Sequence, residues 1–403
     1  MLDRVLVGQV QRRVEASGLP LAVILWNGET VGTPPDAARV RIRLNGKHSL
    51  KALASPSLGG LARAYVEGAL DLDGDIHDIL ALGNRLCAAD DCKPDAGSAG
   101  WKWWRHTRSR DRRNIQYHYD VSNDFYGLWL DAARVYSCAY FRDPGMTLDE
   151  AQRAKLDHIC TKLALKPGER FLDIGCGWGG LVLHAAQHYG VEAVGITLSD
   201  DQHAHASSRA RELGLQGRVE VRRMDYRDVP ETGGYDKIAS VGMFEHVGRG
   251  HLVDYFRKIH DLLKPGGLVL NHGITAAALK SQGLGGGISE FVDDYVFPGG
   301  ELVHVSEVLE AATTGGLECL DAENLRPHYA ATLWHWVTRL EAQTARAVEL
   351  IGQEKYRIWR IYMAGSAHAF ERGWLELWQV LAGKADDGRQ PNYGYNRSYI
   401  YAG

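Results

Sequence analysis

Residues 171–180 read Phe-Leu-Asp-Ile-Gly-Cys-Gly-Trp-Gly-Gly, and this stretch decides the fold that we expect for the chain. A short apolar run is followed directly by closely spaced glycines, which is the pattern of a buried strand that turns into a helix. Such a turn needs glycines because its backbone approaches a ligand closely, outside the carboxyl end of the strand. The stretch therefore predicts a nucleotide-binding turn in an open α/β sheet.

Short apolar runs alternate with segments of helical length along the rest of this region. The alternation predicts a mostly parallel sheet with helices on both faces, with strands at residues 171–174, 191–196, 219–222, 237–241 and 268–271. A Lys-Pro-Gly-Gly turn at residues 264–267 should end one helix before the last of these strands. Residues 298–316 and 327–378 are rich in helix formers and aromatic residues, and we expect them to cover the carboxyl edge of the sheet.

Two classes of nucleotide-binding turn fit these glycines. Gly175, Gly177 and Gly180 match the dinucleotide pattern GxGxxG, which alone is a weak signal. That class needs an acid about 20 residues on, at the end of the second strand, to hold the ribose hydroxyls. The strand ends instead in Thr-Leu-Ser at residues 197–199, and the two aspartates at 200–201 suit the first turn of a helix, whose dipole favours acids.

The residue before the glycines favours the other class. Asp173 lies where S-adenosylmethionine (SAM)-dependent methyltransferases carry an acid that organises the turn facing the amino-acid end of the methyl donor. A glycine-rich turn that binds nothing is the less favoured interpretation, because glycine costs stability. We therefore expect an α/β fold of the class I SAM-dependent methyltransferase type, a Rossmann-like doubly wound sheet, with a smaller N-terminal domain.

Three regions divide the chain. Residues 1–90 mix helical and β-rich stretches, which predicts an α+β domain of a lipid-binding or lipid-carrier kind. Residues 91–113 begin with small, polar and Gly/Pro-containing sequence, typical of a linker, and continue into a Trp/Arg-rich segment. Residues 114–403 should form the SAM-dependent catalytic domain with its helical and aromatic cover.

The composition excludes several classes of protein. A formal charge of −4 and a pI near 6.5 argue against coating nucleic acid, which needs accumulated Lys and Arg. The six cysteines have no CxxC pairs and no histidine partners at metal spacing, so we expect neither a metal site nor a disulfide framework, and a reduced cytoplasmic setting fits best. We also expect no secretion signal and no transmembrane segment, because every apolar run is shorter than the ~18 residues that cross a bilayer.

Motifs spread over residues 114–380 carry a family resemblance. They are residues 117–126, 136–141, 173–180, 197–202, 225–226, 243–248, 272–274, 295–298 and 377–380. Together they closely resemble the cyclopropane-fatty-acyl-phospholipid synthase family and the related mycolic acid cyclopropane synthases. Residues 64–68 and 72–75 resemble bacterial members of this family in the N-terminal region, with less weight because the matches are short.

The resemblance implies a specific reaction and a specific set of residues. A cis double bond of an unsaturated phospholipid acyl chain attacks the sulfonium methyl of SAM, and the resulting carbocation loses a proton from that methyl so that a cyclopropane ring closes. The resemblance implies that the base is a bound bicarbonate ion, held by Cys138, Glu245, His272 and Tyr329, with main-chain contacts at Gly242 and Ile274. The contacts to SAM carry over to Tyr136, Ser137, Asp173, Gly175, Gly177, Thr197, Leu198, Gln202, Asp225, Tyr226 and Val241.

These residue types also suit the chemistry. A histidine that donates and a glutamate that faces the hydroxyl of bicarbonate can hold that ion, while Tyr and Cys add hydrogen bonds without charge. The aromatic rings of Tyr119, Phe125 and Tyr140 would stabilise a nearby cation by about 1 to 2 kcal/mol each when dry. Each residue also has a structural interpretation: a small buried cysteine, a glutamate that caps a helix as His246 beside it does, a core histidine and a packing tyrosine.

A basic, aromatic segment is the part of the chain that we expect to contact lipid. Residues 101–113 contain three tryptophans and six Lys and Arg side chains, a composition that favours the interface of an anionic bilayer. We therefore expect a cytoplasmic, peripherally membrane-associated enzyme, for which a homodimer would help to hold the surface. The alternative is a solvated basic turn whose tryptophans pack between the domains.

Three functions stay open at this point. The first is cyclopropane ring formation on phospholipids. The second is SAM-dependent methyl or methylene transfer to another lipid, or N-methylation of a small molecule by a relative with a similar fold. The third is a lipid-binding module whose catalytic domain has lost its activity, which is disfavoured because the cofactor motifs are intact.

Overall fold

The computed structural model describes residues 2–87, 122–230, 232–279, 287–296, 301–386, 391 and 393–401, with side chains from Val5 onward. The chain forms two compact units. The first consists of Met1–Trp101, Gln282–Pro298 and Val337–His368, and the second of Lys102–Ser281, Gly299–Trp336 and Ala369–Gly403. The predicted linker and the Trp/Arg-rich segment, residues 91–113, lie outside the described residues, as does Tyr119.

The first unit is built around a small sheet in the order β2-β1-β3-β4, in which β1 and β3 run parallel. Its N-terminal elements are α1 (Leu2–Ser17), β1 (Leu21–Ile24), β2 (Thr30–Gly32), β3 (Val40–Leu44), α2 (Leu50–Ala54), α3 (Leu58–Val66), β4 (Leu70–Gly74) and α4 (Ile76–Leu86). Their apolar core also contains Phe291 of α11 (Ile288–Tyr295) and Ile361 of α14 (Thr344–Glu371). Two later segments of the chain thus complete the core of this α+β unit.

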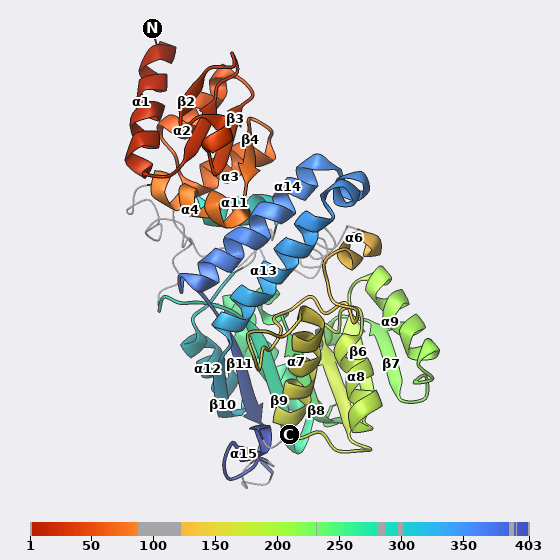
Figure 1. Cartoon of the computed structure of the whole chain (residues 1–403). Helices are drawn as coiled ribbons and strands as arrows, with labels where there is room; N and C mark the ends of the chain where they lie inside the picture. The colour runs from red at the N-terminus through yellow and green to blue at the C-terminus, as the bar shows by residue number, and fades with distance from the viewer. Residues whose placement is uncertain are drawn as a thin grey trace. The chain divides into compact units, whose positions relative to one another are not determined.

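The second unit contains a seven-stranded sheet in the order β10-β11-β9-β8-β5-β6-β7 (Figure 1). The strands are β5 (Arg170–Ile174), β6 (Glu192–Thr197), β7 (Val219–Arg223), β8 (Tyr235–Val241), β9 (Leu263–Ala276), β10 (Glu318–Asn324) and β11 (Leu375–Gly383). Strands β5 to β9 are parallel, while β11 runs antiparallel to both β9 and β10. The chain order reverses between β5 and β8, and ligands of open α/β sheets bind outside the carboxyl ends of the strands at such a switch point.

Helices cover both faces of this sheet. Neighbouring residues of a strand point to opposite faces, and accordingly Phe171 and Leu172 belong to two different apolar clusters. The cluster of Phe171 contains residues of α7 (Leu148–Lys162) and α8 (Gly180–Tyr189), while that of Leu172 contains residues of α10 (Leu252–Leu262) and α12 (Val305–Thr314). The remaining helices are α6 (Asn123–Gly127), α9 (Asp200–Glu212), α13 (Arg326–Ala342) and α15 (Ser398–Tyr401).

The predicted doubly wound α/β fold is confirmed, and all five predicted strands are present. Helix α10 ends at Leu262 as expected, but residues 264–267 belong to β9, where Gly266 takes a φ of +76°. The two antiparallel strands β10 and β11 were not predicted; we expected helical cover as far as Trp378, but β11 begins at Leu375. Its run Leu-Glu-Leu-Trp-Gln-Val-Leu-Ala-Gly is buried without interruption from Gln379 to Gly383, which removes the alternation that identifies a strand in this half.

No helix among the described residues is both long enough and apolar enough to cross a membrane.

Candidate active site

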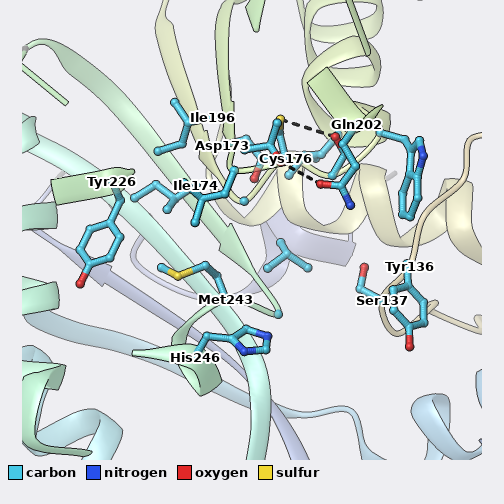
Figure 2. Close-up of a pocket in the computed structure, with 18 of the residues that line it drawn as sticks. Tyr136, Ser137, Asp173, Ile174, Cys176, Ile196, Gln202, Tyr226, Met243 and His246 are labelled. Atoms are coloured by element: carbon cyan, nitrogen blue, oxygen red, sulfur yellow. Dashed lines mark hydrogen bonds between the residues drawn. The ribbon is translucent and has the colours of Figure 1, made fainter. Parts of the chain in front are cut away.

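A cavity of about 360 Å³ lies where the carboxyl ends of β5, β6 and β8 meet. Figure 2 shows Asp173 and Cys176 of the glycine-rich turn on one side of it, Tyr226 at one end, and Tyr136 with Ser137 at the opposite end. The volume is typical of a pocket for a small-molecule ligand. All eleven residues predicted to contact SAM line this one cavity: Tyr136, Ser137, Asp173, Gly175, Gly177, Thr197, Leu198, Gln202, Asp225, Tyr226 and Val241.

The glycine-rich turn between β5 and α8 bends tightly under the cavity. Gly175 and Gly177 have φ values of +85° and +54°, a left-handed region that side chains with a Cβ rarely adopt. The N–H groups of Gly175 and Cys176 donate to Ile196 O at 3.0 and 2.9 Å, which ties the turn to the end of β6. A Cβ at Gly180 would lie 2.9 Å from Val135 Cγ2, so the first residue of α8 must be small.

Asp173, the last polar residue of β5, is buried under the cavity. Its Oδ1 has no hydrogen-bond partner among the described residues. Burial raises the pKa of this carboxyl to about 7, while the positive charge of Lys155 acts in the opposite direction. A buried carboxyl without a partner costs stability, and a cationic ligand group would satisfy it.

The carboxyl end of β6 differs from that of a dinucleotide-binding sheet. β6 ends in Thr197, which donates from Oγ1 to Gln202 Oε1 at 2.8 Å, and the strand end carries no acid. Asp200 and Asp201 begin α9, as predicted for first-turn acids. Asp225 accepts hydrogen bonds from Arg227 Nε at 2.8 Å and Nη2 at 2.6 Å.

The four side chains predicted to hold an anion are buried but do not line this cavity. Glu245 Oε1 accepts from Ile274 N at 2.7 Å, and the carbonyl of His272 accepts from Gly242 N at 2.8 Å. The two predicted main-chain contacts, Gly242 and Ile274, therefore use their N–H groups within the protein. Gly242 itself lines the cavity, so this pair of strand ends adjoins it.

Cys138 contacts the residue before α13, and Tyr329 lies in the first turn of that helix. Cys138 is completely buried, and its thiol contacts Leu325 O at 3.9 Å, one helical turn before Tyr329. Burial raises the pKa of this thiol, so it stays protonated. The phenol ring of Tyr329 packs against Phe370, with ring centroids 4.8 Å apart. Cys138, Glu245 and His272 form no hydrogen bonds with one another.

Glu245 and His272 each keep one buried polar atom without a partner among the described residues, Oε2 and Nε2 respectively. Burial raises the pKa of Glu245 to about 7. Burial, with the positive charge of Lys155 second, lowers the pKa of His272 well below its ordinary value, so the ring is neutral. Gln379 Nε2 lies 3.2 Å from His272 Nδ1; an amide nitrogen donates, so Nδ1 accepts and Nε2 carries the proton.

Two aromatic predictions need correction or restriction. Tyr140 was expected to offer a ring face to a substrate cation, but its ring stacks on His158 and His328 with centroids 4.1 and 4.7 Å apart. Both faces are therefore covered. Phe125 is fully buried against Tyr126 and Trp129, so its ring belongs to the packing around α6.

Several cavity residues were not predicted from the sequence. Lys155, Arg134, Met243, His246 and Lys258 all line the cavity. His246 had been expected to have a structural role only. For Lys155 a signal was present, because a lysine stands among the core-facing positions of α7, between Gln152 and Ile159.

The fold and site are those of a class I SAM-dependent methyltransferase: a Rossmann-like sheet, a bent glycine-rich turn and an acid before that turn. A model of the family described as mycolic acid cyclopropane synthetase matches residues 106–380, and the chain belongs to this family. A second model, described as a domain of unknown function (DUF7884), matches residues 13–86.

Similar proteins cover different shares of the chain. A probable fatty acid methyltransferase of Pseudomonas putida is 44% identical over 94% of this chain and 95% of its own length. Cyclopropane mycolic acid synthase 1 of Mycobacterium tuberculosis is 37% identical over 67% of this chain and 96% of its own. A solved mycolic acid cyclopropane synthase, complexed with SAH and CTAB, aligns with a TM-score of 0.64 at 35% identity, over 67% of this chain and 97% of that one. Coclaurine N-methyltransferase, at 23% identity and a TM-score of 0.60, shares the fold.

Proposed function

We propose that this enzyme transfers a methylene derived from SAM to the cis double bond of an unsaturated phospholipid acyl chain and closes a cyclopropane ring. Membership of the family supports SAM-dependent alkylation of a lipid. The names of the relatives, a fatty acid methyltransferase and cyclopropane mycolic acid synthases, support an acyl chain as the acceptor. The observation that carries the proposal is the pair of unpartnered buried atoms, Glu245 Oε2 and His272 Nε2, beside the cavity.

Ring closure sets the chemical requirement for this pair. When the alkene attacks the sulfonium methyl, the electron pair of the S–CH₃ bond stays on sulfur, and the acyl chain becomes a carbocation. The ring closes when a proton leaves the transferred carbon and its C–H electron pair forms the third bond of the ring. The site therefore needs a base close to a cation, without a group that would be alkylated itself.

Bicarbonate fits the two unpartnered atoms as this base. His272 carries a proton on Nε2 and can donate, while Glu245 Oε2 can accept, so the two buried atoms offer the donor and the acceptor that bicarbonate requires. When bound, bicarbonate supplies the oxygen that takes the proton. The thiol of Cys138 and the phenol of Tyr329 add polar contacts without charge. The N–H groups of Gly242 and Ile274 hold His272 and Glu245 in place.

The proposal places the reaction at the surface of a phospholipid bilayer. An acyl chain must leave the bilayer to reach a cavity at the carboxyl edge of a sheet. We propose that the Trp/Arg-rich residues 101–113 and the N-terminal α+β unit make the lipid contact from the cytoplasmic side, as a peripheral enzyme. Replacing Trp103, Trp104, Arg112 and Arg113 together should then weaken binding to anionic vesicles, and unchanged binding would exclude this contact.

The test is incubation of the full chain with SAM labelled in its methyl carbon and vesicles of an unsaturated phospholipid. Mass analysis of the acyl chains should show addition of CH₂, and NMR should show ring protons. Glu245→Gln should abolish this product, because the amide of glutamine donates where the carboxylate accepts. Glu318→Gln, an exposed site on β10, is the matched control and should retain activity.

Two outcomes would contradict the proposal. Label that appears on an amine metabolite and not on lipid would instead favour N-methylation. Label on the acyl chain with an intact methyl group would favour methyl transfer without ring closure.

A further inference from the structure

A buried lysine faces the cavity from α7. Lys155 is 2% exposed and lines the cavity together with Ser137 and Asp173. Its Nζ donates to Ser137 Oγ at 2.9 Å, which uses one of its three N–H donors. Among the described residues no carboxylate lies within ion-pair distance, 4.0 Å, of this ammonium group. A cation so deeply buried normally requires a paired anion.

The neighbouring serine adds a second donor. Because Ser137 Oγ accepts from Lys155, its own hydroxyl proton points away from the lysine, and no acceptor for it is present among the described residues. Two hydrogen-bond donors, one of them charged, therefore meet at the Tyr136 end of the cavity. A carboxylate has two oxygens and accepts two such bonds at once.

Asp173 supplies the opposite charge in the same cavity. Its buried Oδ1 has no partner among the described residues, and it forms no ion pair with Lys155. Each charge nevertheless acts on the pKa of the other group. The fold thus buries a cation, Lys155, and an anion, Asp173, without pairing them, and each keeps hydrogen-bonding capacity. This arrangement is complementary to a ligand that carries both a negative and a positive group.

We propose that Lys155, with Ser137, binds the α-carboxylate of the methyl donor, while Asp173 binds its α-ammonium group, so that the two residues divide recognition of the amino-acid zwitterion. This inference rests on the use of SAM in the proposed function. It assigns Lys155 as a binding residue. It also predicts that Lys155 contributes to binding of the carboxylate and Asp173 to binding of the ammonium group, each without the other.

A purely structural role for Lys155 is less consistent with its surroundings. Asp131, the carboxylate whose charge acts most strongly on Lys155, already accepts hydrogen bonds from Ala133 N at 2.9 Å and Val135 N at 2.8 Å. Burial lowers the pKa of Lys155 to about 8, with the negative charges of Asp131 and Asp173 acting in the opposite direction. The lysine thus remains mostly charged at neutral pH, and the cation lies where a ligand anion can reach it.

The test compares three ligands by titration calorimetry: SAH, an SAH analogue without the α-ammonium group, and an analogue without the α-carboxylate. Lys155→Met should weaken the two ligands that keep the carboxylate by about 30-fold or more, since loss of one partner of a buried charge pair costs at least about 2 kcal/mol. The decarboxylated analogue should change by less than about threefold. Asp173→Asn should give the reverse pattern, with selective loss for the ligands that keep the ammonium group.

Equal weakening of all three ligands by Lys155→Met would overturn the inference in favour of a structural role. If that variant does not fold, Lys155→Gln takes its place in the same titrations. The wild-type protein provides an independent arm, because it should bind SAH at least about 100-fold more tightly than 5′-methylthioadenosine, which lacks the amino-acid part. Equal affinities there would also overturn the inference, while a wild-type protein that binds none of these ligands would contradict the use of SAM itself.

Discussion

Replacing Glu245 by glutamine should make the ligand-free protein more stable at neutral and alkaline pH. Burial raises the pKa of this carboxyl from 4.5 to about 7, so the folded state binds its proton more tightly than the unfolded state does. The contribution of this group to stability is therefore full below about pH 4.5 and is lost as the pH rises through about 7. Since a tenfold change in proton affinity corresponds to about 1.4 kcal/mol, the loss is about 3 kcal/mol.

Glutamine removes the titration and keeps the carbonyl oxygen that accepts from Ile274 N. The free energy of unfolding of Glu245→Gln minus that of the wild type should therefore rise by about 3 kcal/mol between pH 4.5 and pH 8. Asp173, whose pKa is also raised, is present in both proteins and cancels in the difference.

Urea denaturation of both proteins in bicarbonate-free buffer at several pH values measures this difference. Glu318→Gln on the exposed side of β10 is the matched control and should show no pH-dependent difference. A difference for Glu245→Gln that stays constant across the pH range would refute the reasoning, because it would mean that the carboxyl titrates alike in the folded and unfolded states.

Three further changes test other parts of the account. Arg227→Met should weaken SAH binding about threefold to tenfold, because Asp225 loses its two bonds from the Arg227 guanidinium and keeps the bond from Arg227 N; calorimetry with unchanged affinity would exclude this role. Gly180→Val should lower the midpoint of thermal unfolding, since even its Cβ would approach Val135 to 2.9 Å; an unchanged midpoint would show that α8 shifts freely. Lys162→Met should destabilise the protein by about 1 to 3 kcal/mol in urea, because Glu323, 2.5 Å from Nζ, loses its cation and keeps His158 as a partner; an unchanged stability would contradict that.

The parts of the fold that follow local rules could be predicted. Three features could be recognised directly in the sequence: glycines with positive φ, acids in the first turn of α9 and apolar runs of strand length. The cavity lies at the turn that these features predicted. Nine of the eleven residues expected to contact SAM lie at or after the carboxyl ends of parallel strands, which meet at one edge; Tyr136 and Ser137 reach the same cavity from the segment before α7.

Features that depend on long-range packing could not be predicted. β11 is inserted between β9 and β10, and the continuous burial of its second half, from Gln379 to Gly383, hides the strand period there. The core of the first unit takes Phe291 and Ile361 from segments far along the chain, which no local pattern indicates. The stacking of Tyr140 between two histidines likewise arises from elements distant in sequence.

The residues of the predicted anion site could be named from the sequence, but their contacts could not. Family motifs pointed to Glu245 and His272, and the structure leaves one buried polar atom of each without a partner among the described residues. The sequence could not show that Gly242 and Ile274 use their N–H groups to hold these two residues, nor that Gln379 lies opposite His272 on β11. The contact between Gln379 and His272 depends on the register between β11 and β9, which joins residues 107 positions apart along the chain.

The most direct measurement follows the hydrogens of the transferred carbon. With SAM whose methyl group carries three deuterons, one deuteron must leave if the cation is deprotonated at that carbon. Mass analysis of the modified acyl chain should therefore show one added carbon with two deuterons, and NMR should show a cyclopropane. An acyl chain that keeps all three deuterons, or unlabelled lipid beside a labelled amine, would contradict the account.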